Sequence, residues 1–146
     1  MISLRVRAVL VVGLSIALTG CFTPQPAVKA TDPAAALQSI PSADPAKYDR
    51  IQDMKQWRNP YLIVRAGGVV LFDPADSAEI AFKPQDVLAE LARLPASNWP
   101  YGRVVAAAES GVRSTEQDGV AIRRNKGIVG GTLESAHIAV RWVPSA

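Results

Sequence analysis

The clearest alternation of hydrophobic and polar positions runs over residues 61–72. Two β-rich runs, Y-L-I-V-R-A and V-V-L-F, flank the pair Gly67-Gly68. Tight hairpin loops require positive φ angles that glycine adopts at low cost, so the pattern predicts a β-hairpin with its turn at this pair. Ile63 and Phe72 add apolar mass to the second face of the hairpin. The expected register pairs Ala66 with Val69 and Val64 with Leu71, and these residues share one apolar face with Leu62.

Three further segments have the periodicity of regular elements. Residues 84–94 have apolar side chains at helical spacing, with Pro84 at the start and Pro95 just beyond the end. Residues 103–109 form an apolar run typical of a buried strand, and residues 78–82 indicate a short strand. The apolar positions of the predicted helix are Val87, Leu88, Leu91 and Leu94.

The last part of the chain contains one ambiguous segment and one clear strand. Heptad-like spacing favours a helix over residues 120–134, but each of three glycines there costs a helix about 1 kcal/mol, so a broken helix or a loop stays open. Asp118-Gly119 predicts a turn before this segment. Residues 136–143 alternate and predict a half-buried strand closed by Pro144. In the ambiguous segment, the apolar residues at heptad-like spacing are Ile122, Val129 and Leu133, and the glycines are Gly127, Gly130 and Gly131. In the predicted strand, one face carries Ile138, Val140 and Trp142, and the other carries His137, Ala139 and Arg141.

The segment before the hairpin changes character at about residue 45. Asp44 followed by Pro45 is a helix-start signal, and Asn59-Pro60 ends the helix that it predicts. Residues 22–45 contain five of the eleven prolines and few large apolar side chains, which predicts an extended tether. We expect nothing to hold the helical turn that residues 34–37 could form.

The order of elements is helix, hairpin, helix, strand, helix or loop, strand. The simplest way to cover such a small sheet is to place the helices on one of its faces. The sequence therefore predicts an α+β two-layer sandwich over residues 46–146, preceded by a disordered tether.

The first residues have the pattern of an export signal. Arg5 and Arg7 precede an uncharged apolar run, residues 8–18, which is shorter than the roughly 20 residues that a membrane span needs. The run ends in Leu18-Thr19-Gly20-Cys21, which resembles the lipobox of bacterial lipoproteins. The resemblance implies that Cys21 receives a diacylglycerol group, that cleavage occurs before it, and that its new amino group is acylated. Two or more acyl chains anchor a protein stably to a membrane.

The same resemblance implies an organisation and a location. Residues 1–20 are the cleaved signal peptide and residues 21–45 the lipidated tether. In lipoproteins of bacteria with two membranes, Asp after the Cys favours retention at the inner membrane. Phe22 stands there in this chain, so we expect anchoring at the outer membrane, facing the periplasm, where the organism has two membranes.

Cleavage also changes what the charge implies. The 146 residues carry a formal net charge of +3, and loss of Arg5 and Arg7 lowers it to +1. The densest basic spot, Arg123-Arg124 with Lys126, is no run of the kind that binds nucleic acid, so we expect no nucleic-acid partner. The single Cys and the single His exclude a disulfide framework and multi-Cys or multi-His metal sites.

The element order also resembles the periplasmic domain of the ExbD/TolR biopolymer-transport family. The shared features are residues 62–71, the helix over 84–94 and the strand over 103–109, about two thirds of the chain and without a diagnostic motif. That family carries a membrane-spanning helix with an essential carboxylate. Residues 8–18 contain no carboxylate, so a proton-driven role does not transfer.

Candidate chemistry is sparse. A Ser-His-Asp triad would have to use His137, which the pattern places in mid-strand, and no G-x-S-x-G is present. Asp73, Asp76 and Glu79 lack the alternating ligands of a calcium loop, and the glycines of residues 127–132 lack the ending of a phosphate loop. We therefore expect no catalytic residues, no metal and no cofactor.

The most informative loop is N-W-P-Y-G, residues 98–102. Trp99 and Tyr101 are residue types favoured at contact surfaces, and they are the candidate interaction surface. The plainer interpretation is that these rings, with Trp57, Tyr61 and Trp142, cover the sheet edge as a satellite core. The sequence thus favours a lipid-anchored envelope protein whose domain binds another envelope protein. The alternatives are a ligand-binding or hydrolytic pocket near Trp99, Tyr101 and His137, or a structural spacer.

Overall fold

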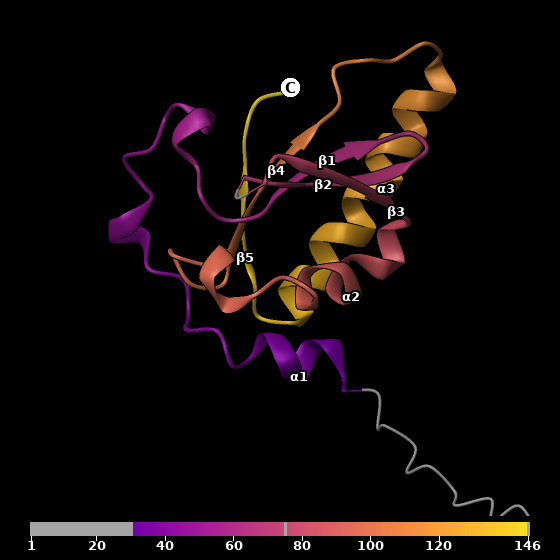
Figure 1. The fold of residues 1–146 in the computed structure, drawn as a ribbon. Helices are drawn as coiled ribbons and strands as arrows, with labels where there is room; N and C mark the ends of the chain where they lie inside the picture. Colours follow the sequence, from indigo (N-terminus) through magenta and orange to yellow (C-terminus); the bar gives the residue numbers. More distant parts are fainter. Residues whose placement is uncertain (1–30, 75, 146) are drawn as a thin grey trace, which may run out of the picture.

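The computed structural model of the protein describes residues 31–74 and 76–145, which form one five-stranded mixed sheet with three α-helices (Figure 1). The strand order is β3-β2-β1-β4-β5, with β1, β2 and β3 antiparallel and β1, β4 and β5 parallel. The predicted α+β class, with helices over one face of the sheet, is confirmed. The strands are β1 (Tyr61–Arg65), β2 (Gly68–Asp73), β3 (Ala78–Phe82), β4 (Val104–Glu109) and β5 (Ala139–Trp142), and the helices are α1 (Pro33–Leu37), α2 (Val87–Ala92) and α3 (Glu116–Ser135).

The hairpin forms as predicted, but its turn lies one residue earlier. Ala66 and Gly67 form the turn, Val64 pairs with Val69, and Leu62 pairs with Leu71. The predicted apolar face survives because each residue keeps its side of the sheet. Gly68 has a φ of 151°, and a Cβ there would lie 2.6 Å from the carbonyl oxygen of Phe82 in β3. Glycine is therefore required where β2 passes β3, which a reading of the hairpin alone could not reveal.

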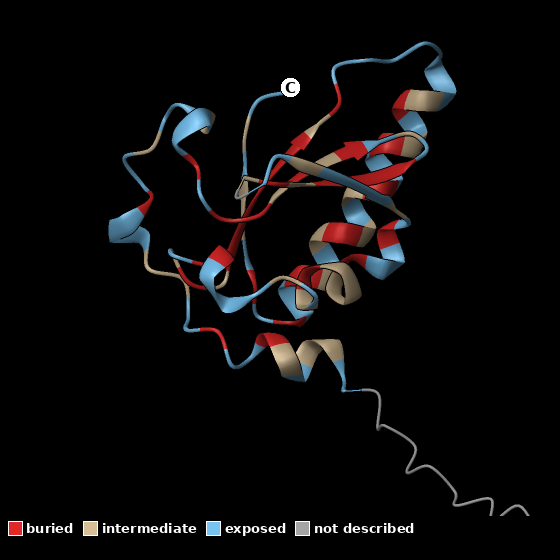
Figure 2. Cartoon of the chain, viewed as in Figure 1, coloured by how far each residue is buried: buried red, intermediate tan, exposed pale blue. Residues whose placement is uncertain are grey.

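The main core lies between the sheet and the helices. Buried positions concentrate on the strands and on the inward sides of the helices (Figure 2). Residues 84–94 form a 3₁₀ turn, Pro84–Asp86, that runs into α2, and Val87 and Leu91 are fully buried, as the stripe predicts. The buried members of this core are Leu37, Ile40, Leu62, Val69, Leu71, Val87, Leu91, Trp99, Val105, Ala107, Val129, Leu133, Ala136 and Ile138.

The ambiguous segment is one continuous helix, α3. It begins earlier than predicted because Thr115 and Asp118 form a capping box, each side chain accepting from the backbone N–H of the other. The predicted turn at Asp118-Gly119 is therefore wrong. Ile122, Val129 and Leu133 are fully buried against the sheet. This packing outweighs the helix-propensity cost of the three glycines.

The predicted tether is wrong over its described part. The side chain of Leu37 is 1% exposed and that of Ile40 is 7% exposed, and both belong to the main core. Asp32 caps α1 through the N–H of Ala34, and Gln38 donates to the carbonyl of Ala136 at 2.8 Å. Residues 33–45 thus belong to the folded domain, whose predicted boundary at residue 46 is too late. The predicted signal peptide and residues 21–30 lie outside the described residues.

The helix predicted after Pro45 is also wrong. Two 3₁₀ turns, Pro45–Lys47 and Met54–Gln56, take its place, although Asp44 does cap the first of them. The segment instead runs in irregular conformation across the sheet face opposite the helices, because Tyr48 and Trp57 pack there against β4.

We expect Gly68→Ala to destabilise the domain by about 1–3 kcal/mol, because the new Cβ meets a backbone carbonyl at a strained φ. Gly67→Ala is the matched control, since nothing lies within 4 Å of a Cβ there, and it should change stability by less than about 0.5 kcal/mol. Urea unfolding of both variants measures the difference. Equal effects at the two positions would contradict this account of the hairpin.

Candidate functional site

The face of the sheet opposite the helices is only partly covered. Residues 41–60 cover β4 there, so that Val104 and Ala106 are at most 1% exposed. The same face of β1 and β2 is left half-buried at Tyr61, Ile63 and Phe72. Between the segment and these strands lies a groove of about 510 Å³, which we call the back groove. It is lined by Met54, Lys55, Trp57, Arg58, Tyr61, Ile63, Phe72, Pro74, Ser77 and Glu79.

Trp57 forms a wall of the back groove, and it is held in an aromatic cluster with Tyr48 and Tyr101. The Trp57 ring is edge-on to Tyr101 at 5.2 Å between centroids and to Tyr48 at 5.8 Å. Edge-to-face pairs of this kind are favourable beyond their buried area. The hydroxyl of Tyr101 donates to the carbonyl of Gln56 at 3.2 Å, which fixes the turn that carries Met54 and Lys55.

Two polar side chains fasten this wall to the sheet. Asn59 is fully buried: its amide donates to the carbonyls of Gly102 and Val104 at 2.8 and 2.7 Å, and its oxygen accepts from the N–H of Tyr101 at 3.0 Å. Arg141 of β5 donates to the carbonyls of Tyr48 and Ile51 at 2.5 and 2.6 Å. The groove wall is therefore preorganised.

The back groove has an apolar floor and a charged rim. Lys55 and Arg58 are exposed on the side of the wall, and Glu79 is exposed on the side of β3. Burial raises the pKa of the Tyr61 hydroxyl on the floor, so this side chain stays neutral. The groove thus suits an apolar group accompanied by negative charge, because two cations face one carboxylate across it.

The residues predicted as the interaction surface have core positions. Trp99 is 4% exposed and belongs to the helix-side core, whereas Tyr101 packs in the aromatic cluster on the opposite face. The interpretation of these rings as core holds for both of them and for Trp57, while Trp142 is 38% exposed.

His137 is placed differently from the prediction. It is exposed and precedes β5, and its φ of 56° and its N–H bond to the carbonyl of Glu134 close the end of α3. It lines a shallow hollow with Glu134 and Trp142 but with neither Trp99 nor Tyr101. The three residues of the alternative pocket therefore do not come together.

The acidic residues named from the sequence form no ligand set. Asp76 accepts from the N–H of Ala78, and Asp73 is buried and accepts from Asn98 at 2.7 Å. Within residues 31–74 and 76–145, no three His, Cys, Asp or Glu side chains are grouped so as to hold a metal ion.

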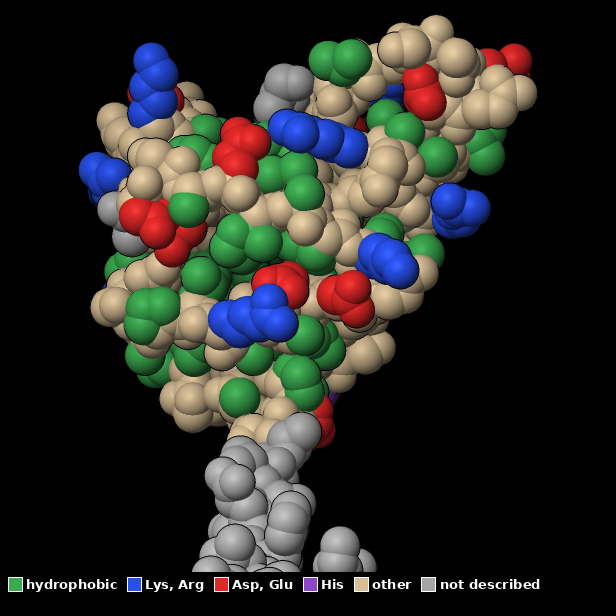
Figure 3. All heavy atoms as spheres, turned by 45° about the vertical axis from the view of Figure 1, so that its right-hand side comes forward, with side chains coloured by type: hydrophobic (Ala, Val, Ile, Leu, Met, Phe, Trp, Pro, Cys, Tyr) green, Lys and Arg blue, Asp and Glu red, His purple; other side chains and the backbone are tan. Residues whose placement is uncertain are grey.

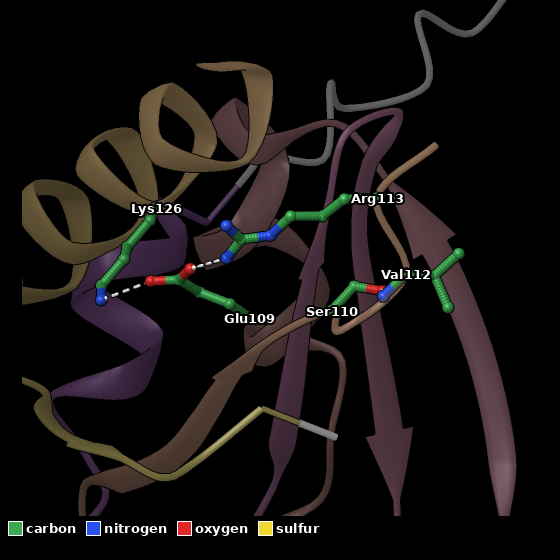
Figure 4. A network of polar contacts seen from close by, with 5 residues as sticks. All are labelled: Glu109, Ser110, Val112, Arg113 and Lys126. Atoms are coloured by element: carbon green, nitrogen blue, oxygen red, sulfur yellow. Dashed lines mark hydrogen bonds and ion pairs between the residues drawn. The ribbon is translucent and has the colours of Figure 1, made fainter. Parts of the chain in front are cut away.

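A polar network lies at the end of β4 (Figure 4). Lys126 of α3 donates to one oxygen of Glu109 at 2.7 Å, and Arg113 donates to the other at 3.0 Å. The Lys126 ammonium also lies 4.5 Å from the centroid of the Trp142 ring. The hydrogen bond from Lys126 lowers the pKa of Glu109. Because both carboxylate oxygens are engaged, the network serves to fasten α3 and the loop after β4 to the sheet.

Charge on the visible surface is mixed. On the face in Figure 3, blue and red side chains are interspersed among hydrophobic ones. That face offers no basic stripe of the kind that follows a nucleic-acid backbone.

Comparison with known proteins does not assign the chain to a family. No protein family, no curated protein and no solved structure matches the chain. The resemblance to the ExbD/TolR family stays a prediction. In the part of the chain that the structure describes, no helix is both long and apolar enough to cross a membrane.

The pKa of Glu109 leads to a prediction about pH. A carboxyl whose pKa is lower in the folded state stabilises the fold above its unfolded pKa of about 4.3, and this contribution is lost as the pH falls through the folded pKa. We expect Glu109→Gln to cost up to about 1 kcal/mol near pH 7, since the ion pairs are partly exposed. Urea unfolding should show the difference begin to shrink below about pH 4.3 and vanish once the pH is below the folded pKa, and it should also shrink in about 1 M salt. A difference independent of pH and salt would contradict this role.

Proposed function

We propose that the chain is a lipid-anchored protein of the bacterial cell envelope whose domain binds another envelope protein and carries no catalytic activity. The lipobox-like pattern that ends at Cys21 supports the anchor. The folded domain begins within about 12 residues of this position, at α1, so it would lie close to the membrane surface that carries the anchor.

The back groove supports the binding role, and it is the observation that carries the proposal. Its apolar floor is open to solvent next to a rigid aromatic wall, which is the arrangement of a contact surface. Its rim has two cations, Lys55 and Arg58, against the single carboxylate of Glu79. The partner segment therefore presents an apolar side chain with a neighbouring Asp or Glu.

No described group of side chains supports catalysis. Among residues 31–74 and 76–145, the groove lining contains no histidine or cysteine to act as a general base or a thiol nucleophile. The exposed His137 lies at another hollow.

The anchor is tested by the variant Cys21→Ser. We expect metabolic labelling with a fatty-acid probe to mark the natural chain and not the variant, because the sulfur that accepts the lipid is gone. Undiminished label on the variant would refute the anchor and leave the binding role of the domain untouched.

The groove is tested by photo-cross-linking in cells. A photoreactive side chain at Lys55, on the rim, should trap one partner protein, and the same group at exposed Arg124 of α3 should not. Mass spectrometry of the adduct should find an apolar residue within two positions of Asp or Glu.

Two variants connect the adduct to the groove. Ile63→Asp charges the floor, and Arg58→Glu reverses one exposed rim charge without disturbing a packed side chain. Each should reduce the Lys55 adduct at least about tenfold, because a buried apolar contact or an ion pair at an interface is lost. An adduct that persists in both variants, or that forms equally from Arg124, would refute the groove as the contact surface.

A further inference from the structure

The outer edge of β3 is exposed, and the function proposed for the back groove gives no reason for this exposure. β3 is the first strand of the sheet order, and β2 is its only strand partner within the described residues. Glu79, Ile80 and Ala81 are all exposed, and Ile80, at 40%, is one of few exposed large hydrophobic side chains. An exposed strand edge with apolar side chains is a template for another strand.

The two faces of β3 differ in chemistry. Ile80 is paired with Leu71 and Phe82 with Val69, so both side chains lie on the helix side of the sheet. Because side chains alternate, Glu79, Ala81 and Lys83 follow the opposite face. Glu79 and Lys83 are four residues apart, about 13 Å along an extended chain, too far to pair with each other. Neither makes an ion pair within the described residues.

We propose that β3 pairs antiparallel with β3 of a second copy of this chain, centred on Ile80, to form one continuous ten-stranded sheet around a two-fold axis. In this register Ile80 lies opposite the partner's Ile80, and Ala78 lies opposite the partner's Phe82, so apolar side chains meet on the helix side. Glu79 lies opposite the partner's Ala81, with the partner's Lys83 on one diagonal and the partner's Glu79 on the other. Diagonal neighbours are within reach of long side chains, so the two-fold axis creates two Glu79–Lys83 ion pairs.

The charges favour a second copy over an unrelated strand. Self-pairing places no like charges directly opposite each other and gives both charges of the edge a partner of opposite sign. The two Glu79 carboxylates are diagonal to each other across the axis, and the Lys83 ammonium on the other diagonal of each offsets their repulsion. A two-fold interface requires this self-complementarity. The other sheet edge is less suitable, because β5 has four residues between His137 in a left-handed conformation and Pro144. This inference does not rest on the function proposed for the back groove.

The pairing is tested by disulfide trapping in the full-length chain. Opposed residues of antiparallel strands have Cα atoms about 4.5–5.5 Å apart, within the range of a disulfide. Ile80→Cys should therefore give a dimer on a non-reducing gel after mild oxidation. The matched control is Val112→Cys, because Val112 is more exposed, at 79%, and lies outside β3. The chain with its natural Cys21 alone gives the background.

Charge reversal tests the register. Adding Lys83→Glu to the Ile80→Cys chain places Glu diagonal to Glu79 of the other copy and should lower dimerisation on the order of tenfold. The further change Glu79→Lys restores opposite charges and should restore the dimer. Equal trapping from Val112→Cys, an undiminished dimer with Lys83→Glu, or a disulfide to a different protein at Ile80→Cys would overturn the proposal.

Discussion

Strand β4 is buried on both of its faces, and the chain must therefore cover the sheet twice. Residues 104–108 are at most 1% exposed, and three of them are alanines. Small side chains let a helix layer approach one face closely while residues 41–60 approach the other. The helices suffice for the first face, as in any two-layer fold. The second cover is a segment of irregular structure, residues 41–60. The back groove exists because this segment covers β4 but leaves the same face of β1 and β2 half-buried.

Irregular segments need hydrogen bonds from side chains, because their backbone N–H and C=O groups have no partners in a helix or a sheet. Three buried asparagines have this role. Asn59 joins residues 41–60 to β4, Asn98 joins the loop after α2 to Asp73, and Asn125 joins α3 to the carbonyls of Arg65 and Ala66. A side-chain amide both donates and accepts, so Asn59 can replace the backbone hydrogen bonds that residues 41–60 lack. The loss of Asn59 would take this donor from the buried carbonyls of Gly102 and Val104, which is costly.

The sequence predicted what depends on local pattern and missed what depends on distant partners. The short strand at 78–82, the apolar run that forms β4 and the helix near residue 87 were located from the sequence, since each signal lies within the element's own residues. Leu37 carried no such signal: it belongs to the core only because α2 and α3 provide a place for it. His137 matched the alternation of β5, but it ends α3 instead, and a left-handed residue leaves no trace in a hydrophobic pattern.

The back groove could be predicted from the sequence only in part. Ile63 and Phe72, its floor, were visible in the sequence as apolar residues on the second face of the hairpin. Its wall was not visible, because the position of Trp57 depends on Arg141 and Asn59, which are distant in the sequence from each other. Trp99 and Tyr101 are aromatic residues of one loop, yet the path of this loop, rather than their chemistry, places Trp99 in the helix-side core and Tyr101 behind the groove wall.

Glu79 connects the groove to the free edge of the sheet. It stands at the lip of the back groove and also in the outer strand. In the monomer its carboxylate offsets part of the positive charge of Lys55 and Arg58 on the opposite rim. In the paired sheet that we propose, Lys83 of the second copy neutralises it, and the cationic rim then acts alone on whatever enters the groove. Pairing of the edges would thus strengthen the preference of the groove for a segment with an acidic residue, through charge alone and without any change in shape.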